Sequence, residues 1–336
     1  MIKVLIVDDS MVACALVKQM IATSDKFEVV GTAHDGKESI EKTKELKPDV
    51  VIMDINMPEM DGIEATKIIM KECPTAILVF TTEDVARVGY TAIEAGAVDI
   101  LPKPDFEQLD DRFTSLFLHK IESAAGALLE RNYDNGNLDA SEKTNQKFKI
   151  VCIGTSTGGP VAVQTLLKDF PEDFPLPILI TQHIEVGFDT HYVSWLSSCL
   201  KLKVSLATDG EVPMPGHVYV APADKHLVIS PSANGGILRL SDEPPLFFLR
   251  PAVDMMFKSG AQVYKNECLA VLLTGMGRDG ADGAKVVKDN GGFVICESEE
   301  TCVVFGMSKS AIELGAASRV LPIDKIGKLV LSIAAN

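Results

Sequence analysis

Short apolar runs alternate with segments of helical periodicity over the first hundred residues of the chain. Runs rich in Val, Ile and Leu, which indicate buried strands, cover residues 2–7, 27–31, 49–53, 76–80 and 98–101. Apolar positions recur with a helical period near residues 11–23, 37–46, 61–71 and 84–95. Because strands that alternate with helices usually pair in parallel, this pattern predicts a doubly wound α/β domain with functional loops at the carboxyl ends of its strands.

The helical rhythm continues through residues 105–131 and then stops. Residues 133–147 are rich in Asn, Asp, Glu and Lys without periodic apolar positions, which is the composition of a flexible connector. Strand-like and helix-like segments alternate again from residue 148 onward. We therefore predict a (βα)5 domain over residues 1–124, a linker over 125–147, and a second doubly wound, mostly parallel α/β domain over 148–336.

The composition narrows the possible classes of function. The 336 residues carry a net charge of −15, which argues against nucleic acid or an anionic membrane as the main partner. No apolar run approaches the roughly 18 residues of a membrane span, and the first residues lack a signal-peptide pattern. The seven cysteines lie mostly in apolar segments and contain no Cys-x-x-Cys pair, so we interpret them as reduced core residues. We expect a soluble, cytoplasmic protein without membrane insertion.

Polar residues follow the strands of the first domain at their predicted carboxyl ends. These residues are Asp8 and Asp9 after the first strand, Asp54 after the third, Thr81 after the fourth and Lys103 after the fifth. Three carboxylates that converge at one edge repel each other unless a hard cation joins them, and oxygen ligands suit Mg²⁺. A lysine and a hydroxyl opposite them complete a pocket for a phosphoryl group. Each residue alone has an ordinary structural explanation, but the combination favours a phosphorylation site.

Together with Met57-Pro58-Glu59-Met60-Asp61-Gly62, these residues resemble a two-component receiver domain along its whole length. The resemblance implies a flavodoxin-like (βα)5 fold in which Asp54 accepts a phosphoryl group from a histidine kinase. It also implies an Mg²⁺ site formed by Asp8, Asp9, Asp54 and the Asn56 carbonyl, phosphoryl-sensing roles for Thr81 and Lys103, and a cis Lys103-Pro104 bond. Because a receiver is a switch, we expect the second domain to carry the output.

The second domain opens with a strand-like run that leads through Gly154-Thr155-Ser156-Thr157-Gly158 into a helical pattern. This segment fits G-x-S-x-G, in which glycines permit the strained turn that exposes a nucleophilic hydroxyl. We predict that Ser156 is this nucleophile. The ordinary alternative, which an isolated match would favour, is that Ser156 or Thr157 merely caps the helix. A phosphate-binding P-loop would need Gly-Lys-Ser/Thr, and the chain has Gly158-Gly159-Pro160 instead.

A nucleophilic serine needs a base, an orienting group and an oxyanion site. The next buried strand ends in Gln182-His183, which predicts that His183 lies beside Ser156 at the edge of the sheet. A third strand, residues 269–273, runs into a glycine-rich turn that contains Asp279, a candidate for orienting the histidine. The backbone N–H groups of Thr157 and Met276 are candidates for binding a developing oxyanion.

The same glycine-rich turn supports a competing hypothesis. Gly275-Met276-Gly277-Arg278-Asp279-Gly280 satisfies G-x-G-x-x-G between a strand and a helix, and Glu297 ends the next strand, 17 residues beyond Gly280. This pattern is close to the fingerprint of a dinucleotide-binding fold. Against it, the strand arrives late in the domain, and the hypothesis leaves Ser156 and His183 without roles.

Several blocks of the second domain occur in a recognisable order, namely Ile153 to Pro160, Thr181-Gln182-His183, Asp209-Gly210-Glu211, Arg250 to Asp254, Leu273 to Ala281 and Cys302 to Met307. Behind a receiver, they resemble the catalytic domain of the chemotaxis protein-glutamate methylesterase family. The resemblance implies that Ser156 attacks a glutamate methyl ester on a chemoreceptor, that His183 takes its proton, and that Asp279 holds the imidazole. It also implies deamidation of glutamine, activation by phosphorylation, and an esterase site that needs no cofactor.

Two segments depart from the family pattern beside the expected cleft. The chain has Leu249 before Arg250-Pro251, where the family often has histidine, and Ile184-Glu185 after His183, where Met-Pro is common. These changes leave an alternative open, a phosphorylation-gated module that binds receptors with altered or lost hydrolase activity.

Overall fold

The computed structural model describes residues 1–336 apart from 84, 105–109, 128–145, 185, 234 and 335–336. The chain divides into two compact units, residues 1–131 and 132–336. Most of the predicted linker over residues 125–147 lies outside the described residues, as does Glu185. The linker bounds and the domain limits drawn from the sequence therefore stay predictions.

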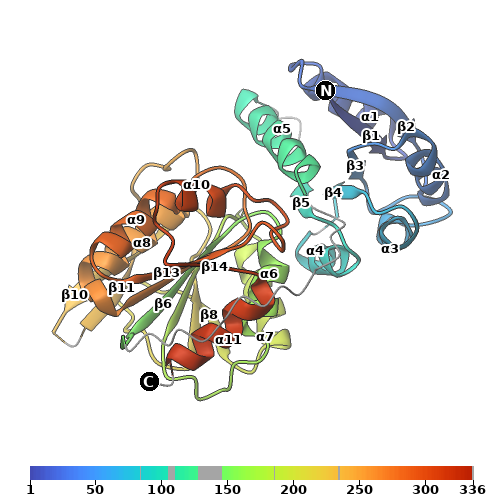
Figure 1. Ribbon diagram of the computed structural model, residues 1–336. Helices are drawn as coiled ribbons and strands as arrows, with labels where there is room; N and C mark the ends of the chain where they lie inside the picture. The colour runs from blue at the N-terminus through green and yellow to red at the C-terminus, as the bar shows by residue number, and fades with distance from the viewer. Residues whose placement is uncertain (84, 105–109, 128–145, 185, 234, 335–336) are drawn as a thin grey trace. The chain divides into compact units, whose positions relative to one another are not determined.

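The first unit is a five-stranded parallel sheet with the strand order β2-β1-β3-β4-β5. Its strands are β1 (Ile2–Val7), β2 (Phe27–Ala33), β3 (Val50–Met53), β4 (Ala76–Thr81) and β5 (Asp99–Pro102) (Figure 1). Its helices are α1 (Met11–Ile21), α2 (Gly36–Leu46), α3 (Gly62–Glu72), α4 (Val85–Glu94) and α5 (Asp111–Ala125). Strands β3 and β4 are buried along their whole length, as parallel strands covered by helices must be. The order is that of flavodoxin-like sheets, so the predicted fold is confirmed.

Two helices of this unit, α1 and α3, begin close to the predicted phosphorylation site, and a capping side chain fixes the start of each. Ser10 and Asp61 are the N-caps of α1 and α3, and their side chains accept backbone N–H groups in the first turn. Helix α3 begins so close to Asp54 that a Cβ on Gly62 would lie 1.9 Å from the Asp54 carbonyl oxygen. Only glycine permits this approach, which fixes the backbone around Asp54.

The second unit is a seven-stranded parallel sheet with the order β14-β13-β12-β6-β7-β9-β8, accompanied by the antiparallel hairpin β10-β11. The strands are β6 (Ile150–Thr155), β7 (Ile178–Gln182), β8 (Lys203–Leu206), β9 (His217–Val220), β10 (His226–Ser232), β11 (Gly235–Ser241), β12 (Cys268–Leu272), β13 (Phe293–Glu297) and β14 (Arg319–Leu321). The helices are α6 (Gly159–Leu167), α7 (Asp189–Cys199), α8 (Val253–Tyr264), α9 (Ala281–Asp289), α10 (Met307–Glu313) and α11 (Ile323–Ala334). In Figure 1, α6, α7 and α11 lie on one side of this sheet and α8, α9 and α10 on the other. The predicted doubly wound, mostly parallel domain is confirmed.

The strand order of the second sheet reverses at β6. From β6 the chain adds β7 beside it, then β8 at the outer edge and β9 between β7 and β8, and it later returns to the other side of β6 to add β12, β13 and β14. A reversal of this kind leaves a crevice beyond the carboxyl ends of the central strands. The segments after β6, β7 and β12, which carry the candidate hydrolase residues, therefore share one edge.

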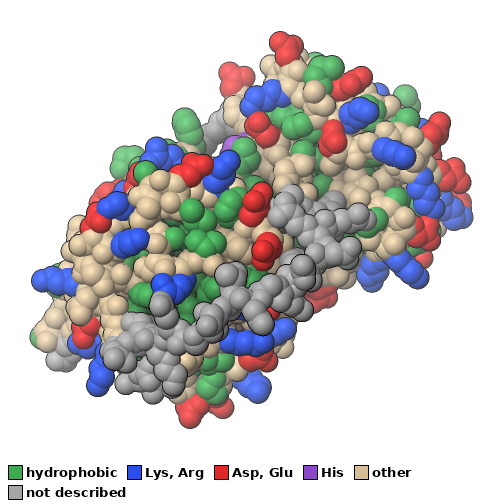
Figure 2. Space-filling model, viewed as in Figure 1, with side chains coloured by type: hydrophobic (Ala, Val, Ile, Leu, Met, Phe, Trp, Pro, Cys, Tyr) green, Lys and Arg blue, Asp and Glu red, His purple; other side chains and the backbone are tan. Residues whose placement is uncertain are grey.

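The surface charges, the cysteines and the helices bear on the expectations from composition. Lys and Arg side chains are interspersed with Asp and Glu on the face shown in Figure 2. All seven cysteines are free thiols, and five of them are buried. Within the described ranges, none of the helices combines the length and hydrophobicity needed to span a bilayer.

Candidate functional site

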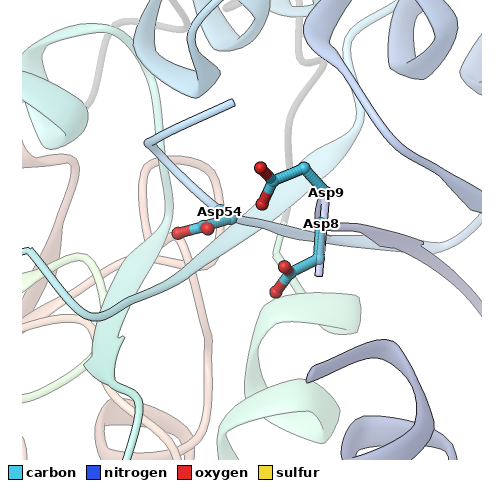
Figure 3. Close-up of side chains that lie close together, drawn as sticks. All are labelled: Asp8, Asp9 and Asp54. Carbon is cyan, nitrogen blue, oxygen red and sulfur yellow. The ribbon is translucent and has the colours of Figure 1, made fainter. Parts of the chain in front are cut away.

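Three carboxylates meet at the carboxyl edge of the first sheet, as the sequence predicts. Asp8 and Asp9 follow β1 and Asp54 follows β3, and one carboxylate oxygen from each lies within 4.8 Å of the other two (Figure 3). Lys103, beyond β5, places Nζ 2.7 Å from Asp8 Oδ2 and 2.8 Å from Asp54 Oδ2. Asp8 and Asp54 are buried and Asp9 is exposed, so the cluster opens to solvent on the side of Asp9.

The charges in this cluster do not balance. Burial raises the pKa of Asp8, although the hydrogen bond and the charge of Lys103 oppose the change. Burial alone would lower the pKa of Lys103, but hydrogen bonds to Asp54 and Asp8 outweigh it and raise this pKa. One ammonium group therefore faces three carboxylates, and the excess of oxygen ligands with negative charge fits a hard divalent cation.

The other residues predicted for this site lie nearby. The Thr81 carbonyl accepts the Lys103 N–H at 2.8 Å, and the Thr81 hydroxyl accepts the Glu83 N–H at 3.2 Å. Asn56 lies two residues beyond Asp54, is exposed, and donates its side-chain amide to Glu83. A metal-binding role for its carbonyl stays a prediction.

One backbone expectation for the receiver is wrong. Among the described residues, the cis peptide bond lies at Arg250-Pro251 and not at Lys103-Pro104. X-Pro bonds favour the trans isomer by about 0.5–1 kcal/mol, so a Lys-Pro pair does not by itself impose the cis form.

Ser156 lies in the turn between β6 and α6, and it does not cap the helix. The N-cap of α6 is Gly158, with φ of +77°, and no side chain caps this helix. The Ser156 N–H instead donates to the Thr274 carbonyl at 3.0 Å. The alternative in which Ser156 or Thr157 is a helix cap is therefore wrong.

The two glycines of the G-x-S-x-G segment serve different purposes. Gly158 supplies the positive φ at which the chain turns into α6. Gly154 belongs to β6, where a Cβ would lie 2.2 Å from a methyl group of Val253, so it permits close packing of α8 against the strand. The strained backbone expected for both glycines of this segment is therefore found at Gly158 and not at Gly154.

His183 follows β7 and lies beside the serine turn. Thr155 pairs with Gln182 in the sheet, and the His183 N–H donates to the Thr155 carbonyl at 3.1 Å. The Gln182 side-chain Nε2 donates to the carbonyls of Ser156 at 2.9 Å and His183 at 3.0 Å. Gln182 thus joins the two turns, a role that the sequence analysis missed. The sequence feature that could have revealed this role is the position of Gln182, a polar residue at the end of a buried strand and directly before the predicted base.

His183 and Asp279 form a close side-chain pair, with Nε2 2.7 Å from Oδ2. Because an ionised carboxylate only accepts hydrogen bonds, Nε2 carries the proton and Nδ1 is left as the acceptor. Asp279 also accepts the N–H groups of Val253 at 2.7 Å and Asp254 at 3.0 Å, at the start of α8. Burial alone would raise the pKa of Asp279, but the bonds from His183 and these N–H groups outweigh it and lower the pKa.

The exposure of the three side chains increases toward the serine. The Asp279 side chain is 1% exposed and the His183 side chain 8% exposed, while Ser156 is partly exposed. A substrate can therefore reach the hydroxyl while the carboxylate stays shielded from water, which strengthens its interaction with the imidazole.

The loop after β12 contacts the serine turn from the other side. The Thr274 hydroxyl donates to the Thr157 carbonyl at 2.9 Å. Gly275 lies so close that a Cβ on it would be 2.7 Å from the Ser156 Cβ. Met276, the next residue, is therefore near the serine, where the sequence predicts an oxyanion donor.

The geometry contradicts the dinucleotide hypothesis. The Gly275 N–H donates to the Val304 carbonyl at 3.0 Å, and the Gly275 carbonyl accepts the Met307 N–H at 2.8 Å. Glu297, the expected ribose ligand, is 1% exposed, and its Oε2 accepts the Thr274 N–H at 2.9 Å. Both ends of the fingerprint are occupied by contacts within the protein.

Glu297 makes the stability of this unit depend on pH. Burial raises the pKa of Glu297 from 4.5 to about 7, although hydrogen bonds from Thr301, Thr274 and Cys302 oppose the change. Between roughly pH 4.5 and 7 the folded state thus binds a proton that the unfolded chain has lost, so stability falls as pH rises. The pKa difference corresponds to a loss of about 3 kcal/mol once Glu297 is fully ionised. We expect Glu297→Gln, which cannot ionise, to abolish this fall.

Urea unfolding at several pH values between about 5 and 8 measures the effect. Trp195 is the only tryptophan of the chain and lies in α7 of the same unit, so its fluorescence follows the relevant transition. The exposed neighbour Glu300 offers a matched control, Glu300→Gln, which should keep the wild-type dependence. The same fall in stability in Glu297→Gln as in wild type would contradict the assignment.

Comparison with known proteins agrees with this architecture. A family model described as CheB methylesterase matches residues 151–330, and one described as response regulator receiver domain matches residues 4–114. The first match alone covers more than half of the chain. The chain belongs to the CheB methylesterase family.

Relatives in the CheB methylesterase family match nearly the whole chain. The protein-glutamate methylesterase/protein-glutamine glutaminase of Thermotoga maritima is 41% identical over 343 residues, which cover 99% of this chain and 98% of the relative. Protein-glutamate methylesterase/protein-glutamine glutaminase 2 of Anaeromyxobacter dehalogenans is 40% identical over 327 residues, which cover 97% and 95%. The crystal structure of the Thermotoga maritima CheB methylesterase catalytic domain is 44% identical with a TM-score of 0.55, and it covers 56% of this chain and 99% of that structure.

Proposed function

We propose that this chain is a phosphorylation-activated protein-glutamate methylesterase and protein-glutamine glutaminase that acts on chemoreceptors in sensory adaptation. The observation that carries the proposal is the His183–Asp279 pair, 2.7 Å apart, beside the partly exposed Ser156. Membership of the CheB methylesterase family supports the same activity. A receptor-binding module without hydrolysis is less well supported, because it gives this pair no role.

The reaction is an acyl transfer through a covalent intermediate. Ser156 Oγ attacks the γ-carbonyl carbon of the esterified glutamate, and its proton passes to His183 Nδ1. Asp279 stabilises the imidazolium through the Nε2–H bond. The N–H groups of Thr157 and Met276 bind the oxyanion.

Collapse of the oxyanion expels methanol, which takes the proton from His183 and leaves an acyl ester on Ser156. Water then attacks this ester and gives its proton to His183, and the free carboxylate of the substrate departs as Ser156 is restored. With a glutamine substrate the same steps release ammonia.

Phosphorylation at Asp54 is proposed to control this reaction. A chemotaxis histidine kinase supplies the phosphoryl group, and Thr81 and Lys103 contact it. Mg²⁺ would be held by Asp8, Asp9, Asp54 and the Asn56 carbonyl, and when bound it would supply positive charge next to the phosphoryl oxygens. The three converging carboxylates, which bring one oxygen each within 4.8 Å of the others, support this assignment. We infer that the protein acts in the cytoplasm, because the proposed kinase and the proposed receptor domains are cytoplasmic.

We expect a small phosphodonor such as acetyl phosphate to raise methanol release from methylated receptor membranes. The increase should fall within the roughly 5- to 150-fold range that is typical of coupling between two sites. Asp54→Asn should abolish the increase and keep the basal rate, because the hydrolase residues are unchanged. The exposed Glu45 provides a matched control in the same unit, since Glu45→Gln should be activated like wild type.

Methanol release from a panel of methylated receptors tests the proposed function as a whole. Receptor binding without methanol release, with or without the phosphodonor, would support the binding module instead. Activation that persists in Asp54→Asn would refute the phosphorylation site and leave the hydrolase assignment standing.

A further inference from the structure

An exposed aromatic turn, residues 246–249, has no part in the reaction described above. Leu246 and Leu249 exchange backbone hydrogen bonds of 3.1 and 2.9 Å, so Phe247 and Phe248 form a two-residue tip. The Phe247 residue is 46% exposed and Phe248 is 91% exposed. In the described part of the chain, Phe248 is the most exposed large hydrophobic residue.

The backbone of this aromatic turn is unsuited to phenylalanine. Phe247 and Phe248 have φ of +52° and +67°, the pattern of a two-residue hairpin turn that normally contains Asn-Gly. The other described non-glycine residues with positive φ are Lys47, Glu59, Asp224 and Lys265, all of which are polar. Two bulky residues are strained at such positions, and the exposed Phe248 gains little from packing. Strain without a stabilising contact indicates a functional reason for the residue.

The base of the aromatic turn is held firmly. His226 is fully buried, accepts the Ala252 N–H through Nδ1 at 3.1 Å, and places Nε2 3.3 Å from the Pro244 carbonyl. It therefore joins the two sides of the segment that carries the turn. Arg250 donates from Nε and from the terminal Nη2 to Asp224 Oδ1 at 2.9 and 2.6 Å. A contact surface that is ordered before binding loses little entropy when a partner binds.

The aromatic turn lies beside the hydrolase residues. The Phe247 ring centroid is 5.8 Å from Cζ of Arg278, the residue directly before Asp279. The chain that leaves the turn enters α8, whose first N–H, from Val253, donates to Asp279. The turn therefore adjoins Asp279 in two ways, since Phe247 lies near Arg278 and the chain after the turn leads to Val253. A protein substrate is far larger than the glutamate side chain that enters the site. The surface of the substrate next to this glutamate therefore comes to lie against the aromatic turn.

We propose that Phe248 packs against an apolar surface of the substrate protein next to the reacting glutamate, and so favours proteins over small esters. This inference rests on the proposed function, since the occupant is the helical cytoplasmic bundle of a receptor. Exposed glutamates on an amphipathic helix lie about one turn from the apolar positions between neighbouring helices. An aromatic ring without a polar group fits such a groove, and aromatic residues often dominate binding energy when buried at an interface.

Steady-state kinetics of the full-length protein test this inference. We expect Phe248→Ala to raise KM for methylated receptor membranes at least fivefold and to change kcat less than twofold. Hydrolysis of a small ester, p-nitrophenyl acetate, should be unchanged. Phe248→Tyr, which keeps the ring, should restore most of the receptor affinity. Leu314→Ala removes another exposed apolar side chain, beyond the C-terminal end of α10, and should behave like wild type in both assays.

A second variant separates recognition from folding. Asn tolerates positive φ better than phenylalanine, so Phe248→Asn should raise the melting temperature of this unit by a few degrees. It should nevertheless show the same increase in KM for receptor as Phe248→Ala. A more stable protein with weaker receptor turnover cannot be explained by damage to the fold.

Four outcomes would overturn the inference. Unchanged KM in Phe248→Ala would show that the side chain does not contact the substrate, and an equal loss on the small ester would assign the turn to support of the catalytic residues. Higher activity of unphosphorylated Phe248→Ala would mean that Phe248 contacts the receiver domain instead. If wild type hydrolyses the small ester and releases no methanol from receptors, the proposed function fails and this inference fails with it, whatever the variants do.

Discussion

Ser156→Ala is expected to reduce methanol release from methylated receptors by a factor of about 10⁴ or more, since only binding and the oxyanion donors would then remain. The fold should be unaffected, because the hydrogen bonds that position Ser156 come from its main chain. Its N–H donates to Thr274 and its carbonyl accepts from Gly159 and Gln182. Alanine keeps all of these contacts.

The loss should appear in kcat and leave receptor binding intact. Ser197, an exposed serine of α7, offers a matched control, and Ser197→Ala should retain wild-type activity. If Ser156→Ala kept more than a few per cent of the wild-type rate, another group would have to be the nucleophile, and the acyl transfer mechanism would need revision.

Asp279→Asn is expected to lower kcat by about 10³- to 10⁴-fold with little change in KM, the effect seen when the orienting carboxylate of a serine hydrolase becomes an amide. Asp279 Oδ2 accepts both His183 Nε2–H and the Val253 N–H, and Oδ1 accepts the Asp254 N–H. An ionised carboxylate satisfies three donors at once. An amide has one oxygen and one NH₂ group, so it cannot.

Either orientation of the asparagine harms the site. With the amide oxygen toward His183, the NH₂ group opposes the Asp254 N–H. With the NH₂ group toward His183, the imidazole must carry its proton on Nδ1, and it can no longer accept the proton of Ser156. The second orientation explains why the loss falls on kcat.

Single-turnover methanol release measures this loss without interference from product release. Asp289→Asn, at the exposed end of α9, removes a carboxylate that pairs with Lys285 and should leave the rate unchanged. A decrease of less than tenfold in Asp279→Asn would show that His183 does not depend on this carboxylate for its orientation.

Much of the candidate site could be predicted because its residues end buried strands. Parallel strands end at one edge, so the positions of Ser156 and His183 after adjacent strands followed from apolar runs and chain order. The same logic predicted the convergence of Asp8 and Asp54. The ends of strands can be predicted from sequence because each end is marked by the point where a local apolar run stops.

Contacts between loops could not be predicted in this way. Asp279 is fixed by the N–H groups that begin α8, 26 residues earlier for Val253, and nothing in the sequence links the two segments. Glu297 fitted a ribose ligand by spacing, and only the structure reveals that its carboxyl group is buried against Thr274. The sequence also left open whether Ser156 caps α6, because it does not show at which residue the helix begins. In the structure α6 begins at Gly159, and Gly158 is its N-cap.

The bridging amide of Gln182 limits how this enzyme can be regulated. One side chain donates to the carbonyls of Ser156 and His183, the proposed nucleophile and base, so we expect the two turns to shift together when the sheet edge deforms. A conformational signal therefore cannot readily switch the enzyme off by pulling hydroxyl and imidazole apart. We therefore expect control to act on the access of the substrate to these two groups.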